Sequence, residues 1–158
     1  MKRLIVIVML FLGLVFLSGC DEKRKNEEDG MSTNHELDQE TAKTDIILFI
    51  GELEVPVTWE ENGSMQELMD MLPMTIQMKT YSGFEQVGSI PHVASISSQD
   101  VKITTEPGDI VLYRGNQIVI FYGSNTWAYT RLGHVELDQS RMEELLGNGD
   151  VEITIKAK

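Results

Sequence analysis

From residue 46 onward, short apolar segments are separated by glycine, proline and asparagine. Runs of this length between turn residues are typical of β-strands. Only two helical patterns interrupt them, and strands and helices do not alternate as they do in parallel sheets. We therefore predict a mainly β fold, a closed antiparallel β-barrel of about eight strands with two short capping helices. The expected strands lie at residues 46–50, 53–57, 74–78, 101–103, 110–113, 118–122, 126–135 and 151–155.

Both helices are predicted from their caps and their apolar spacing. Ser64 and Glu67 have the spacing of a capping box, and Pro73 ends the first helix. Asp138 is expected to cap the second helix, which ends at Gly147. The inward residues are expected to be Met65, Leu68, Met69 and Leu72 in the first helix, and Met142, Leu145 and Leu146 in the second. Residues 81–98 are expected to form a loop, and Pro56, which cannot donate a hydrogen bond, is expected at a strand edge or bulge.

The first 19 residues have the parts of a secretory signal peptide. Lys2 and Arg3 are followed by an apolar run over residues 4–17. The sequence Leu17-Ser18-Gly19-Cys20 resembles the lipobox of bacterial lipoproteins. That resemblance implies a lipidated Cys20 that holds the protein at the cell membrane, facing outside the cytoplasm, since two acyl chains anchor a protein stably.

Residues 20–44 are expected to be the acylated cysteine and a disordered polar tether, followed by a domain at 45–158. Residues 21–44 hold eight acidic and four basic side chains, too polar to build a core. The whole chain has a net charge of −12. This charge argues against nucleic acid as a partner and against attraction to anionic lipids. The acyl chains on Cys20 are therefore the expected contact with the membrane.

The domain resembles the bacterial cyclophilin-like domains, which are small β-barrels. The resemblance rests on Leu72-Pro73-Met74-Thr75, Tyr81-Ser82-Gly83-Phe84-Glu85, Pro107-Gly108-Asp109-Ile110, Ile120-Phe121-Tyr122-Gly123 and Trp127-Ala128-Tyr129-Thr130-Arg131-Leu132-Gly133. It implies a barrel with two capping helices.

The residues of prolyl isomerases are missing from these segments. Cyclophilins with isomerase activity carry a Phe-His-Arg strand and a Gln-Gly-Gly-Asp segment, and neither string occurs here. The leading hypothesis is therefore a non-catalytic module that binds a small molecule or a peptide. The alternative is a diverged peptidyl-prolyl cis-trans isomerase in which Arg131 stabilises the twisted amide.

The candidate ligand site centres on Arg131. Trp127 and Tyr129 share its face of the strand by alternation, so all three side chains are expected to be partly exposed. An arginine between aromatic rings suits a carboxylate, a carbonyl or a planar ligand. Tyr81, Glu85 and Asn125 join the candidate site through the family resemblance and their expected loop positions. The alternative is a structural arginine paired with a carboxylate such as Glu85.

No cofactor, metal site or catalytic residue is predicted. His92 and His134 have no Cys, Asp or Glu at a metal-ligand spacing, so both are expected to be surface or hydrogen-bonded structural residues. The glycines near residues 51, 115 and 123 are typical of hairpin turns rather than of a phosphate loop.

Overall fold

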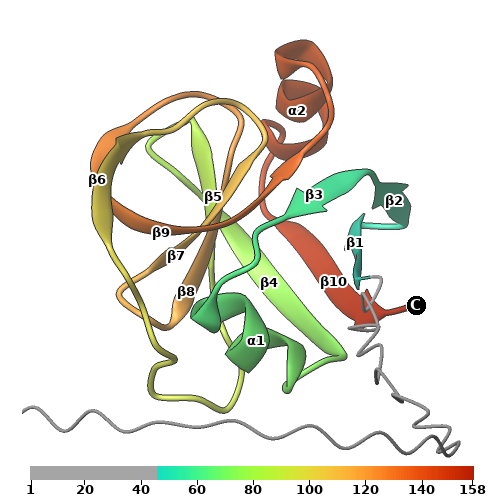
Figure 1. Ribbon diagram of the computed structural model, residues 1–158. Helices are drawn as coiled ribbons and strands as arrows, with labels where there is room; N and C mark the ends of the chain where they lie inside the picture. Colours follow the sequence, from blue (N-terminus) through green and yellow to red (C-terminus); the bar gives the residue numbers. More distant parts are fainter. Residues whose placement is uncertain (1–45) are drawn as a thin grey trace, which may run out of the picture. The chain divides into compact units, whose positions relative to one another are not determined.

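A computed structural model describes residues 46–158, which hold ten strands and two helices (Figure 1). The elements in chain order are β1 (Ile46–Ile50), β2 (Leu53–Val55), β3 (Val57–Trp59), α1 (Gly63–Met69), β4 (Met74–Tyr81), β5 (Glu85–Ser89), β6 (Val101–Thr104), β7 (Asp109–Tyr113), β8 (Gln117–Phe121), β9 (Thr126–Val135), α2 (Gln139–Leu146) and β10 (Val151–Ala157). The expected signal peptide, Cys20 and the tether lie outside the described residues.

The sheet is antiparallel throughout and nearly closes on itself. Its order is β2-β1-β10-β4-β5-β8-β7-β9-β3, and β6 pairs with β9 beside this path. The two end strands, β2 and β3, are consecutive in the chain and separated only by Pro56. Residues 53–59 therefore pair with β1 by their first half and with β9 by their second half. This change of partner brings the two ends of the sheet together as a barrel and occurs at the proline predicted for an edge or bulge.

The main core fills the barrel. It is built from the inward residues of the strands, such as Leu48, Ile110 and Ile155. Each helix adds side chains to this same core, and Figure 1 shows α1 and α2 at different ends of the strands. The helical residues buried in it are Met65 and Leu68 of α1 and Met142 and Leu146 of α2. The predicted barrel with two capping helices is confirmed.

The N-terminal cap of α1 differs from the prediction. Asn62 is the cap, and its Oδ1 accepts a hydrogen bond from the backbone N–H of Met65 at 3.0 Å. Ser64 instead donates to the carbonyl of Ser97 at 2.6 Å, and Glu67 accepts from the N–H of Ser97 at 3.1 Å. The two residues of the expected capping box thus fix the loop before β6, because Asn62 already occupies the cap position. At α2, Asp138 caps the helix as predicted, with Oδ1 2.9 Å from the N–H of Arg141.

The segment 81–98, predicted as a loop, contains the central strand β5. This strand pairs with β4 on one side and with β8 on the other. Sequence patterns missed it because it carries Glu85, Gln86 and Gly88 where a buried strand usually carries apolar residues. Gly88 is required there, since a Cβ at this position would clash with Ile76 and Met78 of the core. β5 and the break at Pro56 account for ten strands instead of the expected eight.

Strand β9 is long and belongs to two pairings. Its first half, from Thr126 to Tyr129, pairs with β6, and its second half pairs with β7 and β3. Figure 1 shows β9 curving across the other strands from β6. As a result, β9 covers part of the outer face of the barrel.

Candidate functional site

A second apolar cluster lies on the outer face of the barrel, separate from the main core. Its buried members are Val111, Val119, Phe121 and Tyr129. The ring of Tyr129 packs edge-on against the rings of Tyr113, at a centroid distance of 5.8 Å, and Phe121, at 5.7 Å. We call these four buried residues the outer cluster. They make the surroundings of the neighbouring polar groups poor in water.

Glu85 is a buried acid beside the outer cluster. It lies directly opposite Phe121 in the β5–β8 pairing, and only 5% of its surface is exposed. Within the described residues, its Oε2 atom has no hydrogen-bond partner. Burial raises the pKa of Glu85 from its ordinary value of 4.5 to about 7. A buried carboxyl oxygen without a partner is uncommon in folded proteins and often marks a functional position.

Two tyrosine hydroxyls lie near the Glu85 carboxyl. Burial raises the pKa of Tyr122 and of Tyr129, and the negative charge of Glu85 raises both further. Asn125 donates from Nδ2 to the hydroxyl of Tyr129 at 3.1 Å. Asn125 is itself held by Thr105, whose Oγ1 accepts from the Asn125 N–H at 3.0 Å. The group therefore has a fixed geometry around one unsatisfied acceptor.

Chemically, this arrangement suits a ligand with an N–H donor. An ammonium, guanidinium or amide N–H could bond to the free oxygen of Glu85, and a cation would also stabilise its ionised form. The tyrosine hydroxyls can donate or accept and would adjust to the ligand.

Arg131 belongs to a different polar group. Its Nη1 donates to Oδ1 of Asp109 at 2.9 Å, and His134 Nδ1 lies 3.0 Å from the same oxygen. This is the pairing with a carboxylate that the sequence left open as the alternative for Arg131, with Asp109 rather than Glu85 as the partner. Asp109 is the partner of Arg131 because it begins β7, the strand paired with the second half of β9.

A β-bulge brings Arg131 and His134 together. Ile110 lies opposite Gly133, whereas Val111 lies opposite Arg131, so Leu132 is an extra residue in β9. Residues three apart normally point to opposite faces of a strand. The extra residue cancels this difference, and both side chains reach Asp109.

The other predicted site residues divide into buried and exposed positions. Tyr129 is buried, contrary to the expectation that it is partly exposed, because β9 folds its ring onto the outer cluster. Trp127 is exposed, at 57%, and lies opposite Ile103 of β6. Tyr81 is also exposed and lies directly opposite Glu85 on β4. The structure thus groups Glu85, Tyr129 and Asn125, with Tyr81 adjacent, and it places Arg131 with Asp109.

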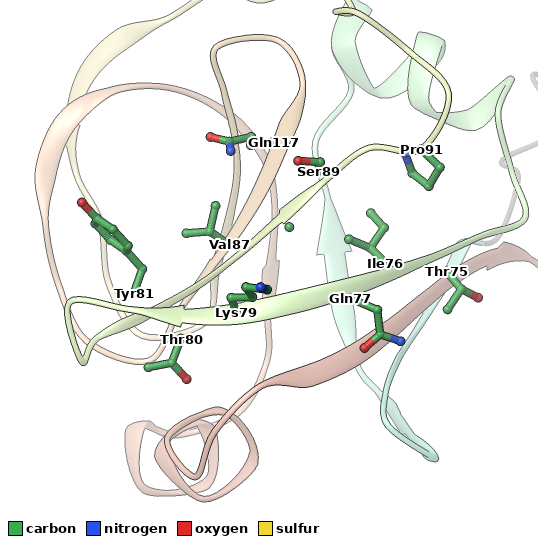
Figure 2. Close-up of a pocket in the computed structure, with 11 residues that line it drawn as sticks. Thr75, Ile76, Gln77, Lys79, Thr80, Tyr81, Val87, Ser89, Pro91 and Gln117 are labelled. Carbon is green, nitrogen blue, oxygen red and sulfur yellow. The ribbon is translucent and has the colours of Figure 1, made fainter.

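A shallow groove of about 530 Å³ runs along β4 and β5 (Figure 2). Tyr81 lies at one end of the labelled residues and Pro91 lies toward the other, with Val87 and Lys79 between them. Tyr81, which lines the groove, is the cross-strand neighbour of Glu85.

The family model described as the cyclophilin-like family matches residues 48–156. The chain belongs to the cyclophilin-like family. The match spans the barrel from β1 into β10 and so includes both polar groups described above. A search of curated proteins found no match to the chain.

Sequence reasoning missed three polar residues of this cyclophilin-like domain. The sequence predicts Asp109 only as part of a family segment, His134 only as a surface or hydrogen-bonded structural residue, and Tyr122 only as the end of the strand at 118–122. The bulge at Leu132 leaves no mark in the alternation of apolar and polar residues, so the grouping of Arg131 with His134 could not be read from it. The one signal in the sequence for Asp109 was an acidic residue directly between Pro107-Gly108 and an apolar strand.

Across residues 46–158, no three His, Cys, Asp or Glu side chains are grouped so that they could hold a metal ion. In the same range, neither helix is long and apolar enough to cross a membrane.

Proposed function

We propose that the protein is a lipoprotein of the bacterial cell membrane whose cyclophilin-like domain binds a ligand, without catalysis, outside the cytoplasm. The ligand is a small molecule or a peptide that donates a hydrogen bond from nitrogen to Glu85. The observation that carries this proposal is the buried Oε2 of Glu85, which has no partner within the described residues.

The membrane part of the proposal rests on the N-terminal sequence. Lys2 and Arg3, the apolar run 4–17 and Cys20 have the order of a lipoprotein signal. A domain with net negative charge gains little from anionic headgroups, so lipid chains on Cys20 supply the attachment.

The preference for a nitrogen donor follows from charge and burial. Residues 46–158 contain sixteen acidic and seven basic side chains, so the domain attracts cations as a whole. Glu85 is the buried position at which a cationic ligand would bind most strongly, because a charge-assisted hydrogen bond is stronger where water is excluded. Tyr81 and the groove of Figure 2 offer neighbouring surface for the remainder of the ligand.

Binding without catalysis is proposed because the Phe-His-Arg strand and the Gln-Gly-Gly-Asp segment of cyclophilins with isomerase activity do not occur in the sequence. In the isomerase alternative, Arg131 would be the donor for a twisted amide. A proline-peptide isomerisation assay with the full chain should therefore show no acceleration. An acceleration that Arg131→Lys abolishes would favour the isomerase over the proposed binding module.

The binding proposal is tested with matched amine probes on the full chain in detergent micelles. Benzylamine represents a small ligand, and trialanine amide represents a peptide. Benzyl alcohol and N-acetyl-trialanine amide are the controls that lack the ammonium group. At least one amine should raise the melting temperature in a saturable manner, because a ligand that binds only the folded state stabilises it.

Two variants locate the effect. Glu85→Gln should abolish the rise in melting temperature, and Glu52→Gln, in the exposed turn after β1, should retain it. Equal stabilisation of wild type and Glu85→Gln, or no response to either amine, would overturn the assignment of Glu85 as the ligand acceptor.

A further inference from the structure

We propose that Arg131 and His134 form a second binding site, which recognises a singly charged carboxylate of a ligand. This inference does not depend on Glu85 or on the function proposed above. It rests on the way one buried carboxylate holds two exposed donors side by side.

Asp109 holds both side chains through the same atom. Its Oδ1 lies 2.9 Å from Arg131 Nη1 and 3.0 Å from His134 Nδ1. The Asp109 side chain is only 3% exposed, whereas the side chains of Arg131 and His134 are 40% and 36% exposed. Its second oxygen, Oδ2, accepts from the backbone N–H of Glu106 at 2.9 Å. Asp109 is therefore held in a buried position, and the side chains of Arg131 and His134 remain accessible to solvent.

The backbone makes this arrangement specific. The bulge at Leu132 is needed to place Arg131 and His134 on one face, as described above. Gly108 is needed as well, because a Cβ there would come within 2.9 Å of the His134 ring and 2.6 Å of the Val135 carbonyl oxygen. Gly108 also has a φ of +99°, a backbone angle that residues other than glycine rarely adopt. These features fix how the ring of His134 is placed.

Arg131 keeps free nitrogen atoms. It uses only Nη1 toward Asp109, so Nε and Nη2 have no side-chain partner among the described hydrogen bonds. His134 uses Nδ1 toward the same Asp109 oxygen, which places its ring beside the guanidinium. A guanidinium with two adjacent free N–H groups matches the two oxygens of a carboxylate.

The charge around the pair favours a carboxylate over a phosphate. Glu106 and Glu136 are exposed residues that flank Asp109 and His134 closely in the chain, and Glu60 is bonded through its N–H to the carbonyl of Leu132. With Asp109 already neutralising Arg131, little positive charge remains for a doubly charged group. A ligand with a single negative charge is therefore favoured over one with two.

The test is an NMR titration of the full chain in detergent micelles, following the ring signal of His134. The probes are acetate for a free acid, N-acetyl-dialanine for a peptide C-terminus, its C-terminal amide as the uncharged control, and inorganic phosphate. Acetate or the peptide acid should shift the signal in a saturable manner, and the amide should not. The two acids separate a small-molecule carboxylate from a peptide carboxylate as the source.

Variants separate this site from a structural ion pair. Arg131→Lys keeps a cation for Asp109 and removes the free fork, so carboxylate affinity should fall about tenfold or more. Arg141→Lys on α2 is the matched control and should not change the affinity, and Glu85→Gln should also leave it intact. Unchanged binding in Arg131→Lys, an equal response to the amide, tighter binding of phosphate, or no response to either acid would overturn the proposal.

Discussion

The indole of Trp59 donates a hydrogen bond from Nε1 to the backbone carbonyl of Ile46 at 3.0 Å. Trp59 lies in β3, at one end of the path of paired strands, and Ile46 lies in β1, next to the other end. The bond therefore crosses the line at which the sheet closes into a barrel. It acts together with Pro56, where the chain changes from one edge of the sheet to the other.

Trp59→Phe should lower the free energy of unfolding by about 0.5–1.5 kcal/mol, because it keeps an aromatic ring and removes this hydrogen bond. Trp127→Phe is the matched control, since Trp127 is exposed on the β6–β9 ribbon and should change stability by less than about 0.5 kcal/mol. Urea titrations followed by circular dichroism provide the measurement. Equal effects of the two substitutions would show that the Trp59 bond adds nothing to closure.

Gly88→Ala should destabilise the domain by about 1–3 kcal/mol, because its methyl group would be forced against Ile76 and Met78 in a filled core. Gly63→Ala, in the first turn of α1, places a methyl group in open space and should be neutral or stabilising by up to about 1 kcal/mol. Thermal unfolding of the two variants compares them directly. A Gly88→Ala variant as stable as Gly63→Ala would contradict the packing of β5 against β4.

The strands with apolar runs could be predicted because the residues that they bury follow one another closely in the sequence. The strands at 110–113 and 118–122 and the Asp138 cap all depend on residues that are neighbours in the chain. β5 could not be found in this way, since it buries polar residues and the partners of Gln86 lie far away in the sequence. Gln86 is fully buried and donates to the carbonyls of Leu146, the last residue of α2, at 2.6 Å and of Gly149 at 2.7 Å.

The candidate site, too, could be predicted only in part. Glu85, Asn125 and Tyr129 do come together, and the register between Thr130 and Arg131 is regular, so Arg131 lies on the face of Tyr129 as alternation predicts. The extra residue at Leu132 follows Arg131 and brings His134 to this same face. The pairing of both residues with Asp109 could not be read from alternation, because it depends on this bulge and on pairing with β7.

Cys20→Ser should remove the acyl chains and shift the protein out of the membrane fraction, or block removal of the signal peptide. Diacylation requires the thiol of this residue, which is the single cysteine of the chain. Metabolic labelling with a radioactive fatty acid, followed by fractionation, is the measurement. Ser18→Ala, which keeps a small residue before the cysteine, should still be labelled. Labelling that persists in Cys20→Ser would contradict the lipoprotein proposal.

Glu85 should make the stability of the domain depend on pH. Burial raises its pKa from 4.5 to about 7, so folding favours the protonated form. The associated stability is complete below the unfolded pKa and is lost as pH rises through the folded value, by up to about 3 kcal/mol. Glu85→Gln carries no charge, so it should exceed the wild type in stability at about pH 8, and this advantage should disappear at about pH 4. Glu52→Gln should follow the wild type. Urea titrations across this range give the comparison, and parallel pH profiles for wild type and Glu85→Gln would argue against a buried acid.

The most direct test of the central claim is a ¹³C NMR titration of the Glu85 side-chain carboxyl, assigned by its loss in Glu85→Gln. The midpoint should lie near pH 7 in the free protein, since the carboxyl is buried without a partner in the described residues. Saturating benzylamine or trialanine amide should lower it, because a bound cation stabilises the ionised carboxylate. A midpoint at the ordinary value near 4.5, or one that neither amine moves, would contradict the account of Glu85 as a buried acceptor for a ligand.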